Sequence, residues 1–189
     1  MALGIGLIIG LVVLFVVLIV GGYVVSIYNS LVHLHNNIKK AWSNIGVLHK
    51  QRADELPKLI SSVKGYMKHE KSTLNELTEA RTAWSKAHTK PEKAAADNML
   101  AGALKSVFAV AENYPDLKAN ENFKHLQTRI SGIENELADR REFYNDSVNT
   151  YNIRIQSFPD IIIAGRLGYK AETLFEVSKK DMKDVKVKF

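Results

Sequence analysis

Hydrophobic and polar positions divide the chain into two parts. The segment from Ala2 to Ile27 is almost wholly apolar and includes the run LIIGLVVLFVVLIV from Leu7 to Val20. About 20 apolar residues in a helix span the hydrocarbon core of a bilayer. We therefore predict a transmembrane anchor over residues 1–27.

A secretory signal peptide is the alternative interpretation of this segment. Such a peptide begins with basic residues, has a shorter apolar core and ends at a small-x-small cleavage site. No basic residue precedes Leu7, and Val24-Val25-Ser26 is a poor cleavage site. The pattern favours an uncleaved single-pass anchor.

Beyond the anchor, apolar residues recur every three or four positions, which is typical of a helix packed lengthwise on others. No turn signal separates the anchor from this pattern. We expect one helix to leave the membrane and continue to about residue 88, with Pro57 as a kink. Its predicted seam is Leu31, Leu34, Ile38, Ala41, Ile45, Leu48, Leu56, Leu59, Val63, Tyr66, Leu74, Leu77 and Trp84.

Three more helices follow, so the fold class is all-α with long helices. We predict a second helix from Pro91 to Glu112, a third from Asn120 to Ser157 and a short fourth from Lys170 to Val177, within one domain over residues 28–178. The tail, residues 179–189, alternates charges without an apolar face and is predicted to be flexible. The seam of the second helix is Met99, Ala103, Val107 and Val110, and that of the third is Phe123, Leu126, Ile130, Ile133, Leu137, Arg140, Tyr144, Val148, Tyr151, Ile155 and Phe158.

The segment Asn113–Asp116, which contains Tyr114-Pro115, is either a reversal or a kink. A reversal sends the third helix away from the membrane. A kink returns it to the membrane, where the Ile161–Gly165 run would reach lipid. Asn, Pro and Asp are ordinary turn residues, so the reversal is favoured. Whether Ile161–Gly165 faces the core, lipid or another subunit stays open.

Charge indicates an orientation for the anchor. The chain has a net charge of +6, and its first 38 residues contain no Asp, Glu, Lys or Arg. Residues 26–53 then contain four basic residues and no acidic one. The positive-inside rule places this side in the cytoplasm and the N-terminus outside. These four cations form either a solvated helix face or a contact with lipid headgroups, and the sequence favours neither.

The sequence contains no recognisable catalytic, cofactor or metal motif. There is no Cys, which excludes thiolate chemistry, and no Glu-x-x-His pair of the di-metal bundle type. Thr73 stands where the zinc metalloprotease motif beginning at His69 needs its second His. No phosphate-binding loop, nucleophile elbow or basic-aromatic nucleic-acid stripe is present. We expect no enzyme activity, no cofactor and no nucleic-acid partner.

Two small features indicate packing instead. Gly6 and Gly10 have the GxxxG spacing that lets transmembrane helices approach closely, so they are candidates for anchor self-association. Charged residues also fall on the seams: Arg52, Glu70 and Arg140. Their long side chains can extend past the seam into water. The sharper hypothesis is an interhelical ion pair between Arg140 and Glu70 that fixes helix register.

Several motifs resemble the LemA family from the anchor to about Val177. The most specific is Ala111-Glu112-Asn113-Tyr114-Pro115-Asp116-Leu117-Lys118-Ala119-Asn120-Glu121-Asn122-Phe123. The others are Ile27-Tyr28-Asn29-Ser30-Leu31, Ala41-Trp42-Ser43-Asn44-Ile45, Lys50-Gln51-Arg52-Ala53-Asp54-Glu55-Leu56-Pro57, Val63-Lys64-Gly65-Tyr66, Thr78-Glu79-Ala80-Arg81, Tyr144-Asn145-Asp146, Tyr151-Asn152 and Ser157-Phe158-Pro159.

The resemblance implies a bacterial single-pass protein of the inner membrane, whose cytoplasmic part is an up-and-down four-helix bundle. It implies no established enzyme activity, cofactor or catalytic residue. Two functions remain. One is a self-associating, coiled-coil-like scaffold or interaction module with membrane lipid and further copies of itself as partners. The other is an adaptor or regulatory subunit of a membrane protein partner, such as an HtpX-type protease or a membrane-stress system. The resemblance links some relatives by gene context to HtpX-type membrane proteases or to membrane remodelling. The Lys-rich tail departs from common members.

Overall fold

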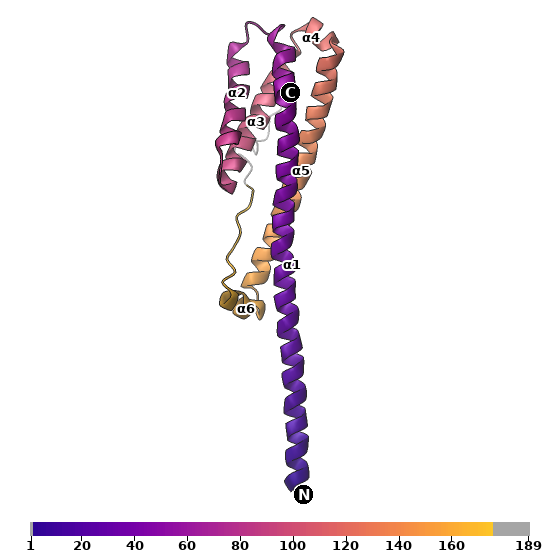
Figure 1. Ribbon diagram of the computed structural model, residues 1–189, viewed down its shortest axis with the longest axis vertical. Helices are drawn as coiled ribbons and strands as arrows, with labels where there is room; N and C mark the ends of the chain where they lie inside the picture. Colours follow the sequence, from indigo (N-terminus) through magenta and orange to yellow (C-terminus); the bar gives the residue numbers. More distant parts are fainter. Residues whose placement is uncertain (1, 176–189) are drawn as a thin grey trace, which may run out of the picture. The chain divides into compact units, whose positions relative to one another are not determined.

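The structure is a computed structural model that describes the backbone of residues 2–175 and the side chains of residues 4–175. Six helices contain most of these residues, and none of the described residues forms a strand (Figure 1). The predicted all-α class is confirmed. The helices are α1 (Ala2–Lys64), α2 (Lys71–Lys86), α3 (Lys90–Ala111), α4 (Pro115–Ala119), α5 (Glu121–Gln156) and α6 (Asp160–Leu167).

The chain divides into two compact units, and α1 and α5 contribute to both. The first unit contains residues 2–41 with Asp146–Thr173, and the second contains Trp42–Asn145 with Leu174 and Phe175. The predicted flexible tail, residues 179–189, lies outside the described residues.

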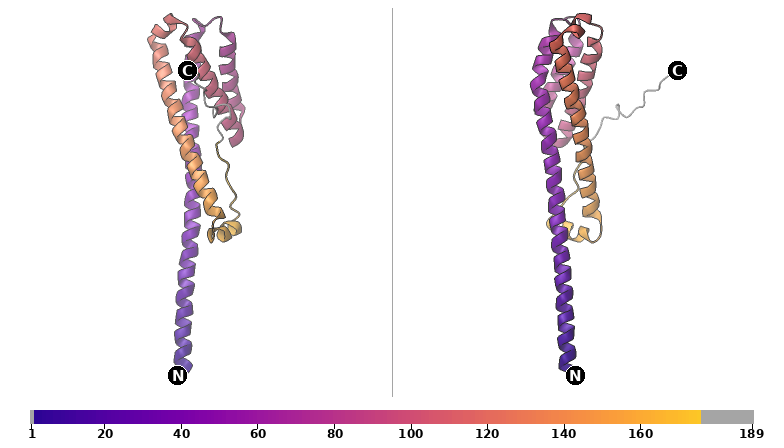
Figure 2. Two further views of the ribbon diagram at one scale, coloured as in Figure 1. Left: turned by 180° about the vertical axis from the view of Figure 1, so that it is seen from behind. Right: turned by 90° about the vertical axis from the view of Figure 1, so that its right-hand side faces the viewer.

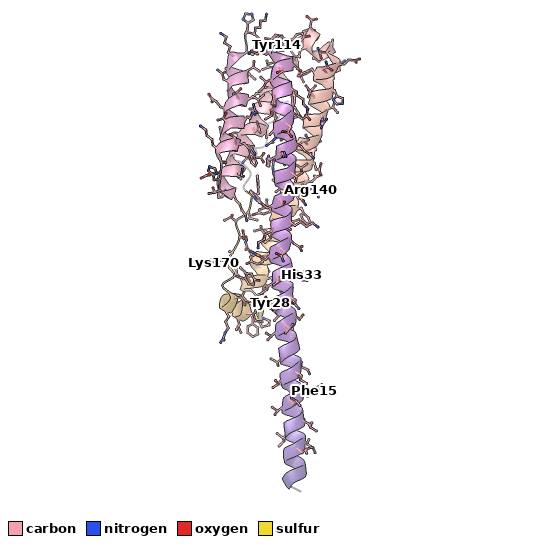
Figure 3. The ribbon with its side chains drawn as sticks, in the orientation of Figure 1. Phe15, Tyr28, His33, Tyr114, Arg140 and Lys170 are labelled. Carbon is pink, nitrogen blue, oxygen red and sulfur yellow. The ribbon has the colours of Figure 1, made fainter. Side chains whose placement is uncertain are left out.

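Helix α1 joins the apolar N-terminal segment to the packed part of the protein without a break. Every residue from Gly4 to Ser26 is exposed, and Ile27 is the first buried one. Figure 3 shows Phe15 and Tyr28 as side chains on the surface of α1. With a mean hydropathy of 3.1 over its most apolar window, α1 is long and apolar enough to cross a membrane. As predicted, Pro57 lies inside this helix.

The helix predicted to continue to residue 88 instead ends at Lys64, so that prediction is wrong. Gly65 follows, and the amides of Tyr66 and Met67 both bond to the carbonyl of Val63, at 3.0 and 2.8 Å, to form a tight turn. Glycine has a low helix propensity, and the buried Met67 side chain is held in the core by the turn. Helix α2 then starts at Lys71.

Predictions for the second and third helices agree with α3 and α5. Thr89 closes a capping box with Glu92 before Pro91 in the first turn of α3. The Asn120 side chain accepts a hydrogen bond from the Phe123 amide at 3.1 Å, as its predicted capping role requires. Between these helices the chain forms the short α4, which was not predicted.

Ion pairs and ring contacts give the helix directions. Asp97 on α3 pairs with Arg141 on α5, and Phe108 contacts Phe123. Helices α3 and α5 are therefore antiparallel, which confirms the reversal at Tyr114-Pro115.

Helix α5 also runs antiparallel to α1. Arg52 pairs with Glu134, and Glu55 pairs with Arg129, so residue numbers rise along one helix as they fall along the other. The expectation that the third helix runs away from the membrane is wrong. The unpredicted break after Lys64 adds one reversal, which sends α5 back along α1.

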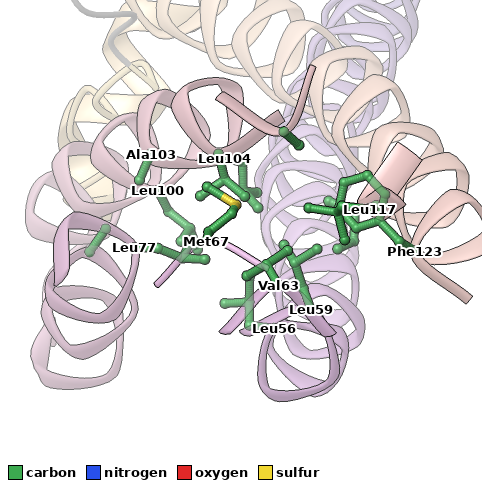
Figure 4. Packing of buried hydrophobic residues seen from close by; sticks show 14 residues of the cluster. Leu56, Leu59, Val63, Met67, Leu77, Leu100, Ala103, Leu104, Leu117 and Phe123 are labelled. Carbon is green, nitrogen blue, oxygen red and sulfur yellow. The ribbon is translucent and has the colours of Figure 1, made fainter. Parts of the chain in front are cut away.

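The hydrophobic core of the second unit lies between α1, α2, α3, α4 and α5 (Figure 4). The predicted seam residues Leu56, Leu59 and Val63 of α1 are fully buried in it. The core cluster is Leu56, Leu59, Val63, Met67, Leu77, Ala80, Leu100, Ala103, Leu104, Val107, Ala111, Leu117, Phe123 and Ile130.

The first unit contains α6 and a non-helical strap that we define as residues 169–173. Figure 2 shows α6 beside α1 in both views. The fourth helix predicted from Lys170 to Val177 is wrong for its described residues, because 170–175 are not helical. The helix instead forms over the Ile161–Gly165 run and ends at Leu167, where Gly168 caps it with a φ of 72° in the left-handed region. Residues 176 and 177 lie outside the described residues.

Candidate functional site: a buried arginine network under a tryptophan groove

The site is centred on Arg52 of α1, whose side chain is fully buried. Its Nη1 donates to Oε1 of Glu134 on α5, and its Nη2 donates to Oδ1 of Asp97 on α3, both at 2.5 Å. Nη2 also lies 2.8 Å from Nδ1 of His49, one turn earlier on α1. One guanidinium group therefore connects three helices.

A second arginine completes the neutralisation of Asp97. Arg141 on α5 forms an ion pair with Oδ2 of Asp97. The Asp97 side chain has no exposed area, and that of Arg141 is only 16 % exposed. Burial of an ion is costly unless it is paired. Two cations against Asp97 and Glu134 supply that pairing.

Burial and the neighbouring cations shift the pKa of both central acid–base groups. Burial, followed by the charges of Arg52, Arg141 and Lys93, lowers the pKa of His49 to about 2, so the imidazole is neutral. Burial raises the pKa of the Asp97 carboxyl, and the two guanidinium groups oppose that shift. Asp97 is held in place by charge pairing, and the neutral His49 by its contact with Arg52.

The contact with Arg52 determines the tautomer of His49. Arg52 is a donor only, so Nδ1 of the neutral imidazole accepts and Nε2 carries the hydrogen. Nε2 is buried and has no hydrogen-bond partner among the described residues. It is a donor available to a ligand or water.

A groove of about 380 Å³ lies next to His49. The Trp84 ring stacks on the imidazole at 3.6 Å between centroids, and Nζ of Lys93 lies 4.5 Å from the Trp84 ring centre. Flat apolar walls with cations suit a planar or acidic group of a ligand or partner. The groove is lined by Trp42, Ile45, Gly46, His49, Lys50, Ala53, Trp84, Ser85 and Lys93.

The structure does not bring Arg140 and Glu70 together. Arg140 is exposed and pairs with Glu136 one turn earlier on α5, at 3.2 Å (Figure 3). Glu70 accepts a hydrogen bond from the Tyr114 hydroxyl at 3.1 Å. An interhelical ion pair on the seam does exist, but it is made by Arg52. On α5 the inward-facing arginine is Arg141, which pairs with Asp97, and not its neighbour Arg140, which was predicted to lie on the seam.

Sequence reasoning missed Asp97 because the predicted seam of the second helix was only partly correct: Ala103 and Val107 are buried, but the seam was taken to begin at Met99, two residues after Asp97. Met99 was predicted to be buried and is 54 % exposed, whereas Leu100 and Leu104 are buried. On the correct face Asp97 precedes Leu100 by three residues and Leu104 by seven. An acid at that spacing was the signal that could have found it.

Gly6 and Gly10 belong to the exposed apolar part of α1 and are not among the residues of this site. An added Cβ at Gly6 or Gly10 would meet no atom within 4 Å, so this face of α1 is open within one chain. Among the described residues no three His, Cys, Asp or Glu side chains gather as a metal site would require.

Comparison with known proteins adds a family and three relatives. The model of the LemA family matches residues 41–189. Protein LemA of Metamycoplasma hominis is 31 % identical over 161 residues, which cover 83 % of this chain and 72 % of that protein. Magnetosome protein MamQ 2 of Paramagnetospirillum magneticum is 36 % identical over 81 residues, and MamQ of Magnetospirillum gryphiswaldense is 32 % identical over 80. These two matches cover 43 % and 42 % of this chain but only 30 % and 29 % of the magnetosome proteins.

Proposed function

Because the chain belongs to the LemA family, we propose that it is a non-enzymatic, self-associating scaffold anchored in the inner membrane of a bacterium. In this proposal the first part of α1 spans the bilayer. Helices α1, α2, α3 and α5 form an up-and-down four-helix bundle in the cytoplasm. The observation that carries the proposal is the continuity of α1, which is both the exposed apolar helix and a core helix.

The chemistry of the buried groups supports a non-enzymatic role. Asp97 is engaged by Arg52 and Arg141, and the pKa of His49 is too low for it to act as a base near neutral pH. In the described part of the chain these groups tie helices together. A rigid network of this kind suits a bundle whose surface is presented to partners.

The orientation rests on charge. The first charged residues after the exposed apolar part of α1 are Lys39 and Lys40, and the next are Lys50 and Arg52. A basic excess on this side favours a cytoplasmic bundle. Arg52 is buried in an ion-pair network, so three exposed lysines carry this argument.

Self-association is proposed to occur through Gly6 and Gly10. Both lie on one face of an exposed helix, where a second helix can approach closely. The test is the particle mass of the full-length protein in mild detergent. We expect an assembly for the wild type and a smaller particle for Gly6→Leu with Gly10→Leu.

Gly22→Leu is the matched control, because Gly22 lies on the opposite face of α1 and its Cβ position is equally open. It should leave the particle mass unchanged. Equal masses for all three proteins would reject the glycine face as the interface. A monomeric wild type would favour the adaptor role and direct the search toward a protease or another membrane protein.

A further inference from the structure

The exposed side of α6 is apolar where a water-facing helix would be polar. Asp160 and Ala164 are buried on the inner side of this helix. On the outer side Ile161 and Ile162 are 47 % and 54 % exposed, and the preceding Phe158 is 82 % exposed. Large apolar side chains gathered on one exposed surface indicate a partner that is itself apolar.

The outer side of α6 carries positive but no negative charge. Arg166 follows Ile162 by one helical turn and is exposed. The one acid of the helix, Asp160, is buried and pairs with Arg154 of α5. An apolar surface bordered by a cation is the pattern of a helix lying at a bilayer surface.

Within the first unit, α6 lies just beyond the membrane-spanning part of α1. The Tyr169 ring, two residues after α6, lies 5.7 Å from the ring of His35. Figure 3 shows α6 beside α1 near Tyr28. Tyr28 is 45 % exposed, and tyrosines concentrate where a transmembrane helix leaves the hydrocarbon core.

We propose that α6 and Phe158 form a second membrane contact, with the exposed isoleucines inserted at the lipid interface beside the anchor. Lipid is the occupant because the exposed apolar surface of α1 ends at Tyr28, beside α6, and α1 has no charged residue before Lys39. The contact gives the first unit two attachment points, which restrict the tilt of this unit over the membrane. This inference rests on the proposed anchoring of α1.

The chain has no cysteine, so single labels can be placed without a background. The full-length variants Val12→Cys, Ile162→Cys and Glu79→Cys are labelled with an environment-sensitive fluorophore and placed in phosphatidylcholine–phosphatidylglycerol vesicles. Lipids with a quencher near the headgroup or deep in the chains then report depth. Val12 reports the anchor, Ile162 the outer side of α6, and Glu79 an exposed position on α2.

We expect the shallow quencher at least to halve the emission at residue 162 and the deep quencher to act less. The deep quencher should act strongly at residue 12, and neither should act at residue 79. Emission at residue 162 that matches residue 79 while residue 12 is quenched overturns the contact and leaves the anchor intact.

Two other outcomes are distinct from these. Shielding of residue 162 from water without quenching by lipid overturns the proposal and indicates a second copy on α6. An unquenched label at residue 12 rejects the anchoring itself.

Discussion

Arg52 carries its charge in the interior because three acceptors surround it. Its two terminal nitrogens contact Glu134, Asp97 and His49, which belong to three helices. Hydrophobic residues of similar volume can stabilise a bundle as well as such a network does. Hydrophobic contacts do not depend on direction and tolerate more than one helix register, whereas a charge pair is satisfied in one register only. We infer that the network fixes the register of α1, α3 and α5.

Asp97→Asn tests this role with little change in volume. The variant leaves Arg52 and Arg141 without their shared carboxylate, so we expect a loss of about 3–5 kcal/mol in the free energy of unfolding. Glu136→Gln is the control, because it removes only the exposed partner of Arg140. Its cost should stay below about 1 kcal/mol. Denaturant unfolding followed by helical circular dichroism measures both, and equal costs would contradict a structural role for Asp97.

His49 predicts a pH dependence of stability. Its pKa is about 2 in the folded protein, against 6.5 for the exposed group. The unfolded chain therefore takes up a proton as the pH falls below 6.5, and the folded one does not. The stability from neutral His49 is fully present above pH 6.5 and is lost as the pH falls. Between pH 7.5 and pH 5.5 the loss should be about 1.4 kcal/mol.

The measurement compares unfolding at these two pH values in the wild type, His49→Gln and the exposed His125→Gln. The His49 variant should lose this part of the pH dependence, whereas the His125 variant should keep it. Staying above pH 5 limits the contribution of Asp97. Its raised pKa acts in the opposite direction, because a folded state that holds a proton more tightly gains stability as the pH falls. The same slope in all three proteins would show that His49 is not buried and neutral.

At the residue scale, periodicity predicted which apolar side chains are buried but not which charges are. Leu31, Ile38 and Ile45 follow the predicted seam. The choice between Arg140 and Arg141 is different, because both positions are compatible with a period near 3.5. Arg141 rather than Arg140 faces the core because Asp97, its partner, lies on another helix. Residue spacing within α5 alone cannot show where that partner lies.

At the element scale, Asn145 and Asn152 of α5 hold the chain segment that follows α6. Asn152 bonds to both the amide and the carbonyl of Glu172, each at 2.9 Å. Asn145 does the same with Phe175, at 2.7 and 3.1 Å. Seven helical residues rise about 10.5 Å, and three extended residues about 10 Å. The spacing of the asparagines therefore matches an extended backbone.

Asn152→Ala should release this segment locally. We expect the Glu172 amide to exchange with solvent at least tenfold faster, because it loses the acceptor Oδ1 of Asn152. The Phe175 amide, which is bonded to Asn145, should change less. Asn149→Ala, at an exposed position of the same helix, is the control. Hydrogen exchange resolved to these amides checks the expectation. Unchanged exchange at Glu172 would contradict the role of Asn152 in holding this segment.

The bonds of Asn145 and Asn152 also show why the extended form of residues 170–175 was not predicted. The residues from Lys170 onward resemble a short helix, but the asparagine side chains satisfy their backbone groups in an extended form. The break after Lys64 was missed because Met67 takes over in the core where the predicted Tyr66 is 39 % exposed. In the first case contacts distant in sequence override local propensity, whereas at the second Gly65 was a local signal for the break.

At the scale of the whole molecule, α1 is both the apolar helix and a wall of the packed core. If two copies meet through Gly6 and Gly10, the assembly contains two bundles. It then presents two copies of the groove next to His49, which Trp42 and Trp84 line. A scaffold needs this arrangement, whereas an adaptor would reserve the same face for another protein.

The most direct test of the scaffold is disulfide crosslinking of the full-length protein in its native membrane. The variant Val17→Cys places a thiol on the face of Gly6 and Gly10, and Phe15→Cys places one on the opposite face. The account predicts an oxidised dimer of two chains for Val17→Cys and much less for Phe15→Cys. Equal yields from the two faces, no dimer at all, or a crosslink only to a different protein would contradict self-association through the anchor.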